Sequence, residues 1–559
     1  MAHHDAAHPD VLVAGAGPVG LTAAAELRRR AVSCRIVDRL PARLPYAKAV
    51  GIQPRTLELW DRIGLVQAAL DVAVPLRGQL TYLNGAEKGR IDLALPPEVP
   101  YGFAALPQYE TERILEEYLN RFGTVVERES ELLSFTQDTT GVSSVLRTPH
   151  GEEEVRSRFL VGCDGAHSSV RKGLGLTFEG GALPDEYMLA DVEVDWDVPR
   201  GYGVRSEHRD AEGALDDVLV CIPLPGEHRY RMSMLVPPEL SAAAPTGPDE
   251  VVHGLEGGRV PGLTHVQEVL DRLSPQPTTA SALRWSSVFR ISHRLAGRYG
   301  QGRVFVAGDA AHIHPPTGAQ GMNTGIQDAW NLAWKLALAV AGTADPDLPA
   351  SYDAERRPVG EEVVGRTVRH ATAGIDADPA DPMTLMRREA QLLVGYPDSP
   401  LVQPPEAQPP EAQPPEAQPP EAGAGPGPQP GERAPDCGGL LAEVTAYPLR
   451  LFDVLRGREH TLVLYGNGPE VPHLEQLAEV IDELAPGQVN ICAVLATTDA
   501  DRAAPVPVYR DAGGEFARMY GVGEGPVAFV VRPDGYLGAR LRPPAGAGLG
   551  SYLSRIFAP

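Results

Sequence analysis

Gly15, Gly17 and Gly20 form a G-x-G-x-x-G pattern in the segment GAGPVG, directly after an apolar run. Glycines at this spacing permit a tight strand-to-helix turn, close approach of a pyrophosphate and close helix packing. The phosphates would lie at the helix N-terminus, where free amides and the helix dipole favour anions. Asp38 ends the next apolar segment, where a carboxylate can bind ribose hydroxyls. The pattern predicts a dinucleotide site and does not separate FAD from NAD; the alternative is a glycine turn in a purely structural unit.

Two later motifs each place an aspartate directly after an apolar run. The segment CDGAHSSVR, Cys163–Arg171, contains Asp164, and the segment AGDAAHIHPPTGAQGMN, Ala307–Asn323, contains Asp309. Each aspartate is expected at the C-terminal end of a buried strand. The amides that open the helix after the third motif would stabilise negative charge on a bound group. Read alone, Asp164 could belong to an ordinary turn and Asp309 could be a helix cap.

In this order, the three motifs resemble those of the class A flavoprotein monooxygenases, the family of p-hydroxybenzoate hydroxylase, over about residues 1–370. The resemblance implies that NADH or NADPH reduces bound FAD, and that O2 forms a flavin C4a-hydroperoxide which hydroxylates an aromatic ring. The run HIHPPTGAQGMNTGIQDAWNLAWKL is most similar to phenol hydroxylases and to the aromatic polyketide hydroxylases of antibiotic biosynthesis. A phenolic or polycyclic aromatic small molecule is therefore the expected substrate.

The resemblance also supplies candidate FAD-binding positions. They are Gly15, Gly17, Pro18, Gly20, Asp38, Arg39, Lys48, Gln108, Asp164, Asp309, Pro315, Gly318, Gly321, Met322 and Asn323. Asp309 is expected to bind the ribityl chain, which Gln108 would approach. Lys48 stands where relatives usually carry arginine, so the cation is kept and the bidentate geometry is lost. No catalytic side chain and no metal ligand is assigned, because in such enzymes the flavin carries the chemistry.

Between about Asp185 and Arg290 the pattern changes to short alternating segments separated by proline and glycine, which predicts an antiparallel sheet. The aromatic substrate is expected between this sheet and the flavin. The candidate lining residues are Tyr230, Met232, Met234 and Trp285. Ordinary core packing is an equal alternative for such residues on a strand, and the roles of Arg231 and His293 are equally open.

The expected fold is α/β, or α+β overall, with a Rossmann-like FAD-binding domain interrupted by the antiparallel-sheet domain. The expected segments are FAD-binding 1–180, substrate sheet 181–285, FAD-binding with connecting helices 286–400, Pro-rich linker 401–435, and thioredoxin-like domain 436–559. The linker contains the QPPEA repeat of Gln403–Ala422, which proline excludes from helices and interior strands.

The expected thioredoxin-like domain has HTLVLYG, His460–Gly466, as its central strand and RPDGY, Arg532–Tyr536, as a hairpin turn. Gly525-Pro526 stands where thioredoxins carry a cis-proline. NGPE follows the central strand in place of paired thiols, so disulfide exchange is excluded. This domain is expected to be a structural or assembly element, and removing residues 403–559 is expected to leave flavin reduction largely intact.

The composition limits the kinds of partner that the protein is expected to bind. The formal net charge of −24 argues against binding to nucleic acid or to an anionic membrane surface. The N-terminus lacks the features of a signal peptide, and no apolar run approaches the ~20 residues of a spanning helix, so a cytoplasmic protein is expected. A homo-oligomer is left open. The alternative functions are a Baeyer–Villiger or epoxidising monooxygenase on the same scaffold, an NAD-dependent dehydrogenase, and a non-catalytic FAD-binding protein.

Overall fold

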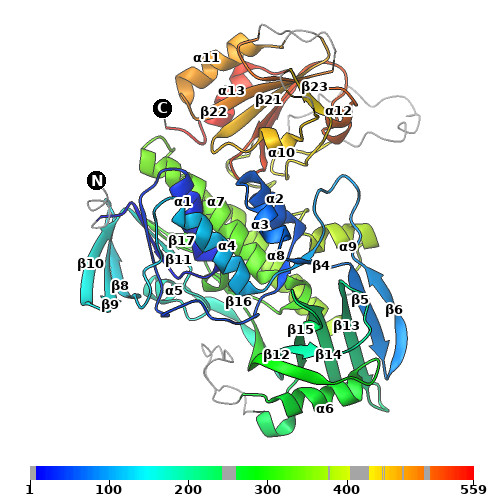
Figure 1. Ribbon diagram of the computed structural model, residues 1–559. Coiled ribbons are helices and arrows are strands. Elements are labelled where there is room, and N and C mark those ends of the chain that lie inside the picture. Colours follow the sequence, from blue (N-terminus) through cyan, green and yellow to red (C-terminus); the bar gives the residue numbers. More distant parts are fainter. Residues whose placement is uncertain are drawn as a thin grey trace.

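The computed structural model describes residues 8–241, 260–374, 378–402, 427–443, 445, 447–468, 471–496 and 504–558 (Figure 1). The QPPEA repeat lies outside these residues. The described chain forms a mixed α/β body with an eight-stranded sheet at one end and a separate six-stranded sheet at the other. The expected fold class is confirmed.

A five-stranded sheet forms the centre of the body, in the order β17-β18-β11-β1-β2. Its strands are β1 (Val11–Ala14), β2 (Cys34–Val37), β11 (Phe159–Gly162), β18 (Val304–Val306) and β17 (Gly300–Gln301). The first four run parallel, and Ala14 pairs with Gly162, which pairs with Val306. The ends of β1, β11 and β18 are therefore level with one another, and each leads into one of the three sequence motifs.

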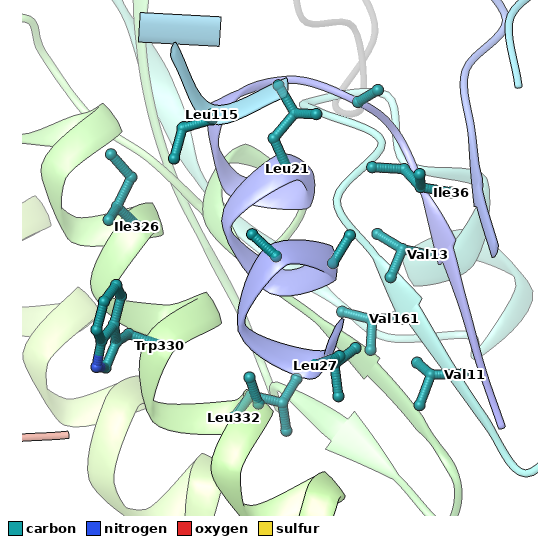
Figure 2. Close-up of a cluster of buried hydrophobic side chains, with 14 of the residues drawn as sticks. Val11, Val13, Leu21, Leu27, Ile36, Leu115, Val161, Ile326, Trp330 and Leu332 are labelled. Carbon is teal, nitrogen blue, oxygen red and sulfur yellow. The ribbon is translucent and has the colours of Figure 1, made fainter. Parts of the chain in front are cut away.

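Helices bury both this sheet and one another. The main ones are α1 (Pro18–Arg29), α4 (Gln108–Asn120), α7 (Gly321–Ala341) and α8 (Ser351–Ala373). Figure 2 shows Leu21 and Leu27 of α1 between the strand side chains and α7, which contributes Trp330. The alanine-rich sequence of α1 permits this close approach, because small side chains let the helix axes come together.

The eight-stranded sheet has the order β19-β16-β12-β15-β14-β13-β5-β6. Its strands are β12 (Phe178–Val194), β13 (Tyr202–Arg209), β14 (Leu215–Pro223), β15 (Arg229–Leu235), β16 (Ala280–Ala296), β19 (His312–Ile313), β5 (Gly78–Leu83) and β6 (Ala86–Asp92). Neighbours are antiparallel except β13 and β5, and α6 (Leu263–Leu273) covers one face. The strands β5 and β6 come from within the segment assigned to the FAD-binding domain, so the boundary drawn at residue 180 does not account for them.

The remaining elements of the body are short. A three-stranded sheet joins β3 (Gly51–Ile52), β7 (Ala104–Ala105) and β4 (Val74–Pro75), and another joins β8 (Glu131–Gln137), β9 (Val142–Thr148) and β10 (Gly151–Ser157). The short helices are α2 (Pro54–Arg62), α3 (Val66–Leu70), α5 (Ser169–Gly173) and α9 (Pro382–Glu389). Helix α2 ends at Arg62, and Gly64, two residues later, has the positive φ of 73° that is common just after a helix C-terminus.

The C-terminal unit is a six-stranded sheet in the order β20-β23-β22-β21-β24-β25. Its elements are β20 (Leu440–Ala442), β21 (His460–Gly466), β22 (Val489–Leu495), β23 (Val508–Asp511), β24 (Val527–Val531), β25 (Leu537–Leu541), α10 (Leu451–Val454), α11 (Leu474–Leu484), α12 (Glu515–Met519) and α13 (Gly546–Leu553). The strand His460–Gly466 is fully buried between two neighbours, as expected, and Arg532–Tyr536 connects the hairpin β24–β25. Within the described residues, the cis peptide bond precedes Pro543, so the cis bond expected before Pro526 is wrong.

The C-terminal unit is docked on the body through buried charges. The guanidinium of Arg532 binds both oxygens of Glu355 on α8, with Nη1–Oε1 2.6 Å and Nη2–Oε2 2.8 Å. Lys335 on α7 donates to the same carboxylate at 2.7 Å, and Arg532 also binds Asp534 at 2.6 Å. Apolar side chains from both sides, including Trp334, form one buried cluster around this network. The unit is therefore an integral part of the fold.

Candidate active site

A cavity of about 460 Å³ opens where the three motif loops meet the eight-stranded sheet. Gly17, Asp164 and Asp309, one from each motif, all line it. They meet because their loops leave the level ends of neighbouring parallel strands, the place where α/β sheets bind ligands. The residues named from the sequence that line this cavity are Gly17, Pro18, Arg39, Lys48, Gln108, Asp164, Arg231, Trp285, Asp309, Gly321 and Met322.

The first glycine motif separates into packing and cavity positions. A Cβ on Gly15 would lie 2.2 Å from the carbonyl oxygen of Cys163, and a Cβ on Gly20 would lie 1.9 Å from that of Gly15. A Cβ on Gly17 would meet nothing within 4 Å. Gly17 is also the N-cap of α1 and has no side chain that could cap the first amides of this helix, and Gly17, Pro18 and Val19 all line the cavity. This combination leaves room for a phosphate at the helix N-terminus.

Asp38 lies behind this turn and does not line the cavity. Its Oδ2 accepts a hydrogen bond from the amide of Ala16 at 2.7 Å, and its Oδ1 accepts one from Leu40 at 2.8 Å. From the end of β2, the carboxylate therefore fixes the glycine turn that follows β1. In this structure its observed bonds are to the backbone.

Asp164 lies at the N-terminus of α5, where one of its carboxylate oxygens accepts hydrogen bonds and the other accepts none from the described residues. Its Oδ2 accepts from the amides of Ser169 at 2.7 Å and Val170 at 3.2 Å. Its Oδ1 is buried and has no hydrogen-bond partner among the described residues. Burial raises the pKa of this carboxyl above its usual value. A ligand that donated a hydrogen bond to this buried oxygen would satisfy it, and that bond would favour binding.

Lys48 and Asp309 face each other across the cavity rim. Lys48 Nζ lies 3.7 Å from Asp309 Oδ2, and both side chains are about half exposed. The lysine thus supplies the counter-charge for the third-motif aspartate, which a single ammonium can do without the bidentate geometry of arginine.

Other residues of the third motif hold the start of α7 in place. Asn323 is buried, donates to the carbonyl of Gly51 at 2.9 Å and accepts from the amide of Gln53 at 2.9 Å, which ties α7 to the β3–α2 turn. Gly318 has a φ of 69° and packs against Glu389. Asn323 and Gly318 therefore support the start of α7 and do not line the cavity. Pro315 does not line it either, while Gly321 and Met322 do.

On the sheet side of the cavity, the lining residues differ from those expected. The prediction that Tyr230, Met232 and Met234 line the substrate space is wrong, because they belong to the core cluster between the sheet and α6. Alternate residues of a strand point to opposite faces, so Arg231, between two of them, lines the cavity instead. Trp285 does line it and stacks on Tyr46 with ring centroids 5.1 Å apart.

Sequence reasoning missed several lining residues. They are Tyr46, His167, Leu189, Ser287, Phe289, Arg290 and His314. His314 belongs to the quoted third motif, and its buried Nε2 has no hydrogen-bond partner among the described residues. Position alone, next to Pro315, could have drawn attention to it. Leu189, Ser287, Phe289 and Arg290 follow from the register between β12 and β16, which is not visible in any local pattern. Tyr46 and His167 lie in loops, outside the strands.

Gln108 connects the cavity wall to a buried acid. Its Oε1 accepts from the amide of Ala49 at 3.3 Å, and its Nε2 donates to Glu112 Oε1 at 2.9 Å. Burial raises the pKa of the Glu112 carboxyl from 4.5 to about 7. The folded protein therefore holds this proton more tightly than the unfolded chain does, and stability is lost as the pH rises through this window.

Glu112→Gln is expected to remove this loss of stability at high pH. The free energy of unfolding should match that of the wild type near pH 4.5, and should exceed it by about 1–3 kcal/mol above pH 8. Urea unfolding at both pH values measures the difference, with the exposed Glu117→Gln on the same helix as the matched control. If the variant and the wild type differed in unfolding free energy by the same amount at both pH values, the raised pKa of Glu112 would be contradicted.

The described residues hold no helix with the length and apolar character required to cross a membrane. They also hold no cluster of three or more histidine, cysteine, aspartate or glutamate side chains arranged for a metal ion.

Comparisons with known proteins agree with the geometry. Residues 8–367 match the family model described as an FAD binding domain. A flavin-dependent monooxygenase of Mycobacteroides abscessus is 31% identical over 98% of this chain and 99% of its own length. The 12-dehydrotetracycline 5-monooxygenase/anhydrotetracycline 6-monooxygenase of Streptomyces rimosus is 31% identical over 98% and 99%. A solved complex of aklavinone-11 hydroxylase with FAD and aklavinone has a TM-score of 0.74 at 25% identity, covering 98% of this chain and 99% of that one. The chain belongs to the FAD-binding family of flavin-dependent monooxygenases, and it is an FAD-dependent enzyme that uses O2 and a nicotinamide reductant.

Proposed function

We propose that this enzyme hydroxylates a phenolic or polycyclic aromatic compound of the polyketide type. The observation that carries the proposal is that one cavity joins the three dinucleotide-motif loops to an aromatic face of the eight-stranded sheet. Relatives of this chain support the same class, since they include a 6-methylpretetramide 4-monooxygenase and a pentachlorophenol 4-monooxygenase. The stacked pair Trp285–Tyr46 offers a flat apolar surface on which fused rings can lie.

The residues present fit FAD. The open space at Gly17 and the uncapped N-terminus of α1 suit the pyrophosphate. Asp309 and Gln108 line the cavity where hydroxyl groups of the ribityl chain can donate to their oxygens. The uncapped N-terminus of α7, with Gly321 and Met322 at the cavity, offers amides for the electron-rich edge of the ring system. When bound, FAD would supply the redox chemistry by which electrons from NADH or NADPH reduce O2, with one oxygen atom going to the aromatic ring and the other to water.

The protein's own part is to bind, orient and exclude water. The sheet wall supplies Leu189, Trp285 and Phe289, whose apolar surfaces keep water from the reacting edge of the ring. Asp309 lies beside Lys48 at the rim, and the amides at the start of α7 would accommodate negative charge on a bound flavin. We also infer that the enzyme works in the cytoplasm, where NADH and NADPH are available; its five cysteines are all unpaired.

Product analysis tests the proposal. Full-length enzyme, NADH or NADPH, and a panel of phenols and polycyclic quinones should consume O2 and give a product with one added aromatic hydroxyl. Mass spectrometry detects the added oxygen, and NMR locates it. A lactone with oxygen inserted beside a carbonyl, or an epoxide, would contradict hydroxylation.

Asp309→Ala is expected to weaken FAD binding about 10- to 100-fold, because a charge-assisted hydrogen bond to the cofactor is lost. The ratio of flavin to protein absorbance after gel filtration measures it. The exposed Asp271→Ala on α6 is the control, and should keep full flavin content. An unchanged ratio in Asp309→Ala would remove Asp309 from the FAD site.

A further inference from the structure

A second cavity, the interface cavity, lies where the body meets the C-terminal unit. Its volume is about 280 Å³. The ends of α1 and α7 contribute Arg30 and Leu338 to its wall, and the C-terminal unit contributes His460 and Pro533. Its lining residues are all different from those of the cavity proposed for FAD and the substrate. The interface cavity is therefore a separate space, and it forms only when the two parts of the protein are docked.

One side of the interface cavity is apolar. Trp334 lines it, and so do Ala337, Leu338 and Ala341, which follow Trp334 by three, four and seven positions on α7. Side chains at this spacing lie on one face of a helix. The rings of Trp334 and His460 meet edge-on, with centroids 5.4 Å apart. A ligand in this space therefore has an apolar surface to cover.

The side chains at the end of α1 carry more positive than negative charge. The side chain of Arg30 is 6% exposed, and its Nη1 binds the carboxylate of Glu26. The same carboxylate binds Arg29, with Nε–Oε1 2.9 Å. Within the described residues, no other carboxylate lies at ion-pair distance from either guanidinium. Two guanidinium groups therefore share one carboxylate, and Arg30 is incompletely compensated.

Donor atoms in this wall also lack partners. Nε and Nη2 of Arg30 are buried and have no hydrogen-bond partner among the described residues. The same holds for Nε2 of His460, a residue that is 1% exposed. Burial lowers the pKa of His460 to about 3, so the ring is neutral and can carry its proton on Nε2. A ligand oxygen that accepted from these atoms would remove the cost of leaving buried donors unsatisfied.

These features define the chemistry of a ligand. A guanidinium presents its donors in a planar fork, which the two oxygens of a carboxylate match. Arg458 also lines the cavity, but Glu459 lies 3.8 Å from it, so Arg30 is the better candidate to bind an anion. The volume is below the usual range for sites that enclose drug-sized molecules. The ligand is therefore expected to be small, with one carboxylate and an apolar body.

We propose that the interface cavity binds a small organic carboxylate, whose oxygens accept from Arg30 and His460 and whose apolar body lies along Trp334. This site is additional to the proposed function and does not depend on it. Because both parts of the protein contact the ligand, its binding stabilises the docked arrangement of the body and the C-terminal unit.

Benzoate tests the proposal on the full-length, FAD-loaded enzyme. Benzamide is its neutral counterpart of the same shape, and inorganic phosphate is an anion without an apolar body. Isothermal titration calorimetry measures the binding of each probe, and thermal unfolding measures the change in Tm. The wild type should bind benzoate about 10-fold or more tightly than benzamide or phosphate, and benzoate should raise its Tm. Flavin absorbance reports any benzoate in the active-site cavity, and binding at the interface cavity should leave that absorbance unchanged.

Two variants alter the interface cavity in different ways. Arg30→Gln should weaken benzoate binding about 10- to 100-fold and change benzamide binding less than twofold, because a charge-assisted hydrogen bond is lost. Ala341→Trp should weaken both probes, since the larger side chain occupies part of the cavity. Ala341 is exposed, so this variant should keep the Tm of the wild type without probe. Arg369→Gln, at an exposed arginine on α8, is the matched control and should bind benzoate like the wild type.

The inference is overturned if Arg30→Gln and Ala341→Trp bind benzoate as tightly as the wild type does, because the probe then lies elsewhere. A wild type that binds no benzoate, or that binds benzamide or phosphate equally well, would also overturn it. An equal rise in Tm with benzoate in the wild type and in Arg30→Gln would have the same meaning. Hydroxylated product from an aromatic substrate reports separately on the proposed function, so failure of one is distinguishable from failure of the other.

Discussion

Arg532→Met is expected to lower the free energy of unfolding by about 3–5 kcal/mol, the usual cost of breaking a buried ion pair from one side. Arg532 and Glu355 are both 0% exposed, and they are joined by two short hydrogen bonds across the contact between the C-terminal unit and α8. Methionine fills much of the volume but leaves Glu355 with Lys335 as its remaining cation among the described residues, and leaves Asp534 without its guanidinium. The carboxylates would then be buried and underpaired.

Chemical denaturation of the full-length enzyme measures this effect. Arg518→Met, an exposed arginine on α12 of the same unit, is the matched control and should change stability by about 0.5 kcal/mol or less. Flavin content should fall together with stability in Arg532→Met, because Trp334 and Lys335 lie on α7, whose first residues reach the cavity. A stability equal to that of the Arg518 variant would show that the docking network contributes little.

Gly17→Ala and Gly20→Ala are expected to fail in different ways, although both alter one motif. Gly17 has a φ of −74°, which alanine adopts freely, and open space around its Cβ position. The Gly17 variant should fold with an unchanged Tm but bind FAD ~100-fold or more weakly, a loss of about 2.7 kcal/mol, because the methyl group occupies the phosphate space. The Gly20 variant places a methyl group 1.9 Å from the Gly15 carbonyl oxygen, so its fold should lose about 3 kcal/mol.

Apoprotein titration with FAD and thermal unfolding separate the two effects. Ala23→Gly, a buried position further along α1, controls for changes in helix propensity and should keep FAD affinity. If Gly17→Ala binds FAD like the wild type, the phosphates do not lie at the N-terminus of α1.

The parts of the fold that could be predicted from sequence are those with local signals. Each of β1, β11 and β18 is a short apolar run that leads into a turn motif, so strand, turn and aspartate were all visible in a few residues. Their convergence follows from the rule that parallel strands present their carboxyl ends at one edge. The central strand of the C-terminal unit was visible for the same reason.

The parts that could not be predicted depend on long-range pairing. Alternation along β15 defines two faces, but nothing local says that Arg231 faces the cavity and Met232 faces α6. The pairing of β5 with β13 joins residues more than a hundred positions apart. Both the face that Arg231 presents and the partner of β5 are set by tertiary packing, which strand propensity does not encode.

The docking of the C-terminal unit on the body also could not be predicted from the sequence. Arg532 and Glu355 each look like surface residues in sequence, because charged side chains are rarely buried unless paired. Deletion of residues 403–559 was expected to leave flavin reduction largely intact. The structure weighs against that expectation, since the deletion would leave Glu355 without Arg532 and expose the apolar cluster around Trp334.

The central claim is that three loops distant in sequence hold one flavin. Titrating the full-length apoprotein with FAD tests it most directly, with visible absorbance and flavin fluorescence as readouts. The account predicts saturation at one FAD per chain and bleaching of the bound flavin by NADH or NADPH. A protein whose spectrum is indifferent to added FAD would contradict it.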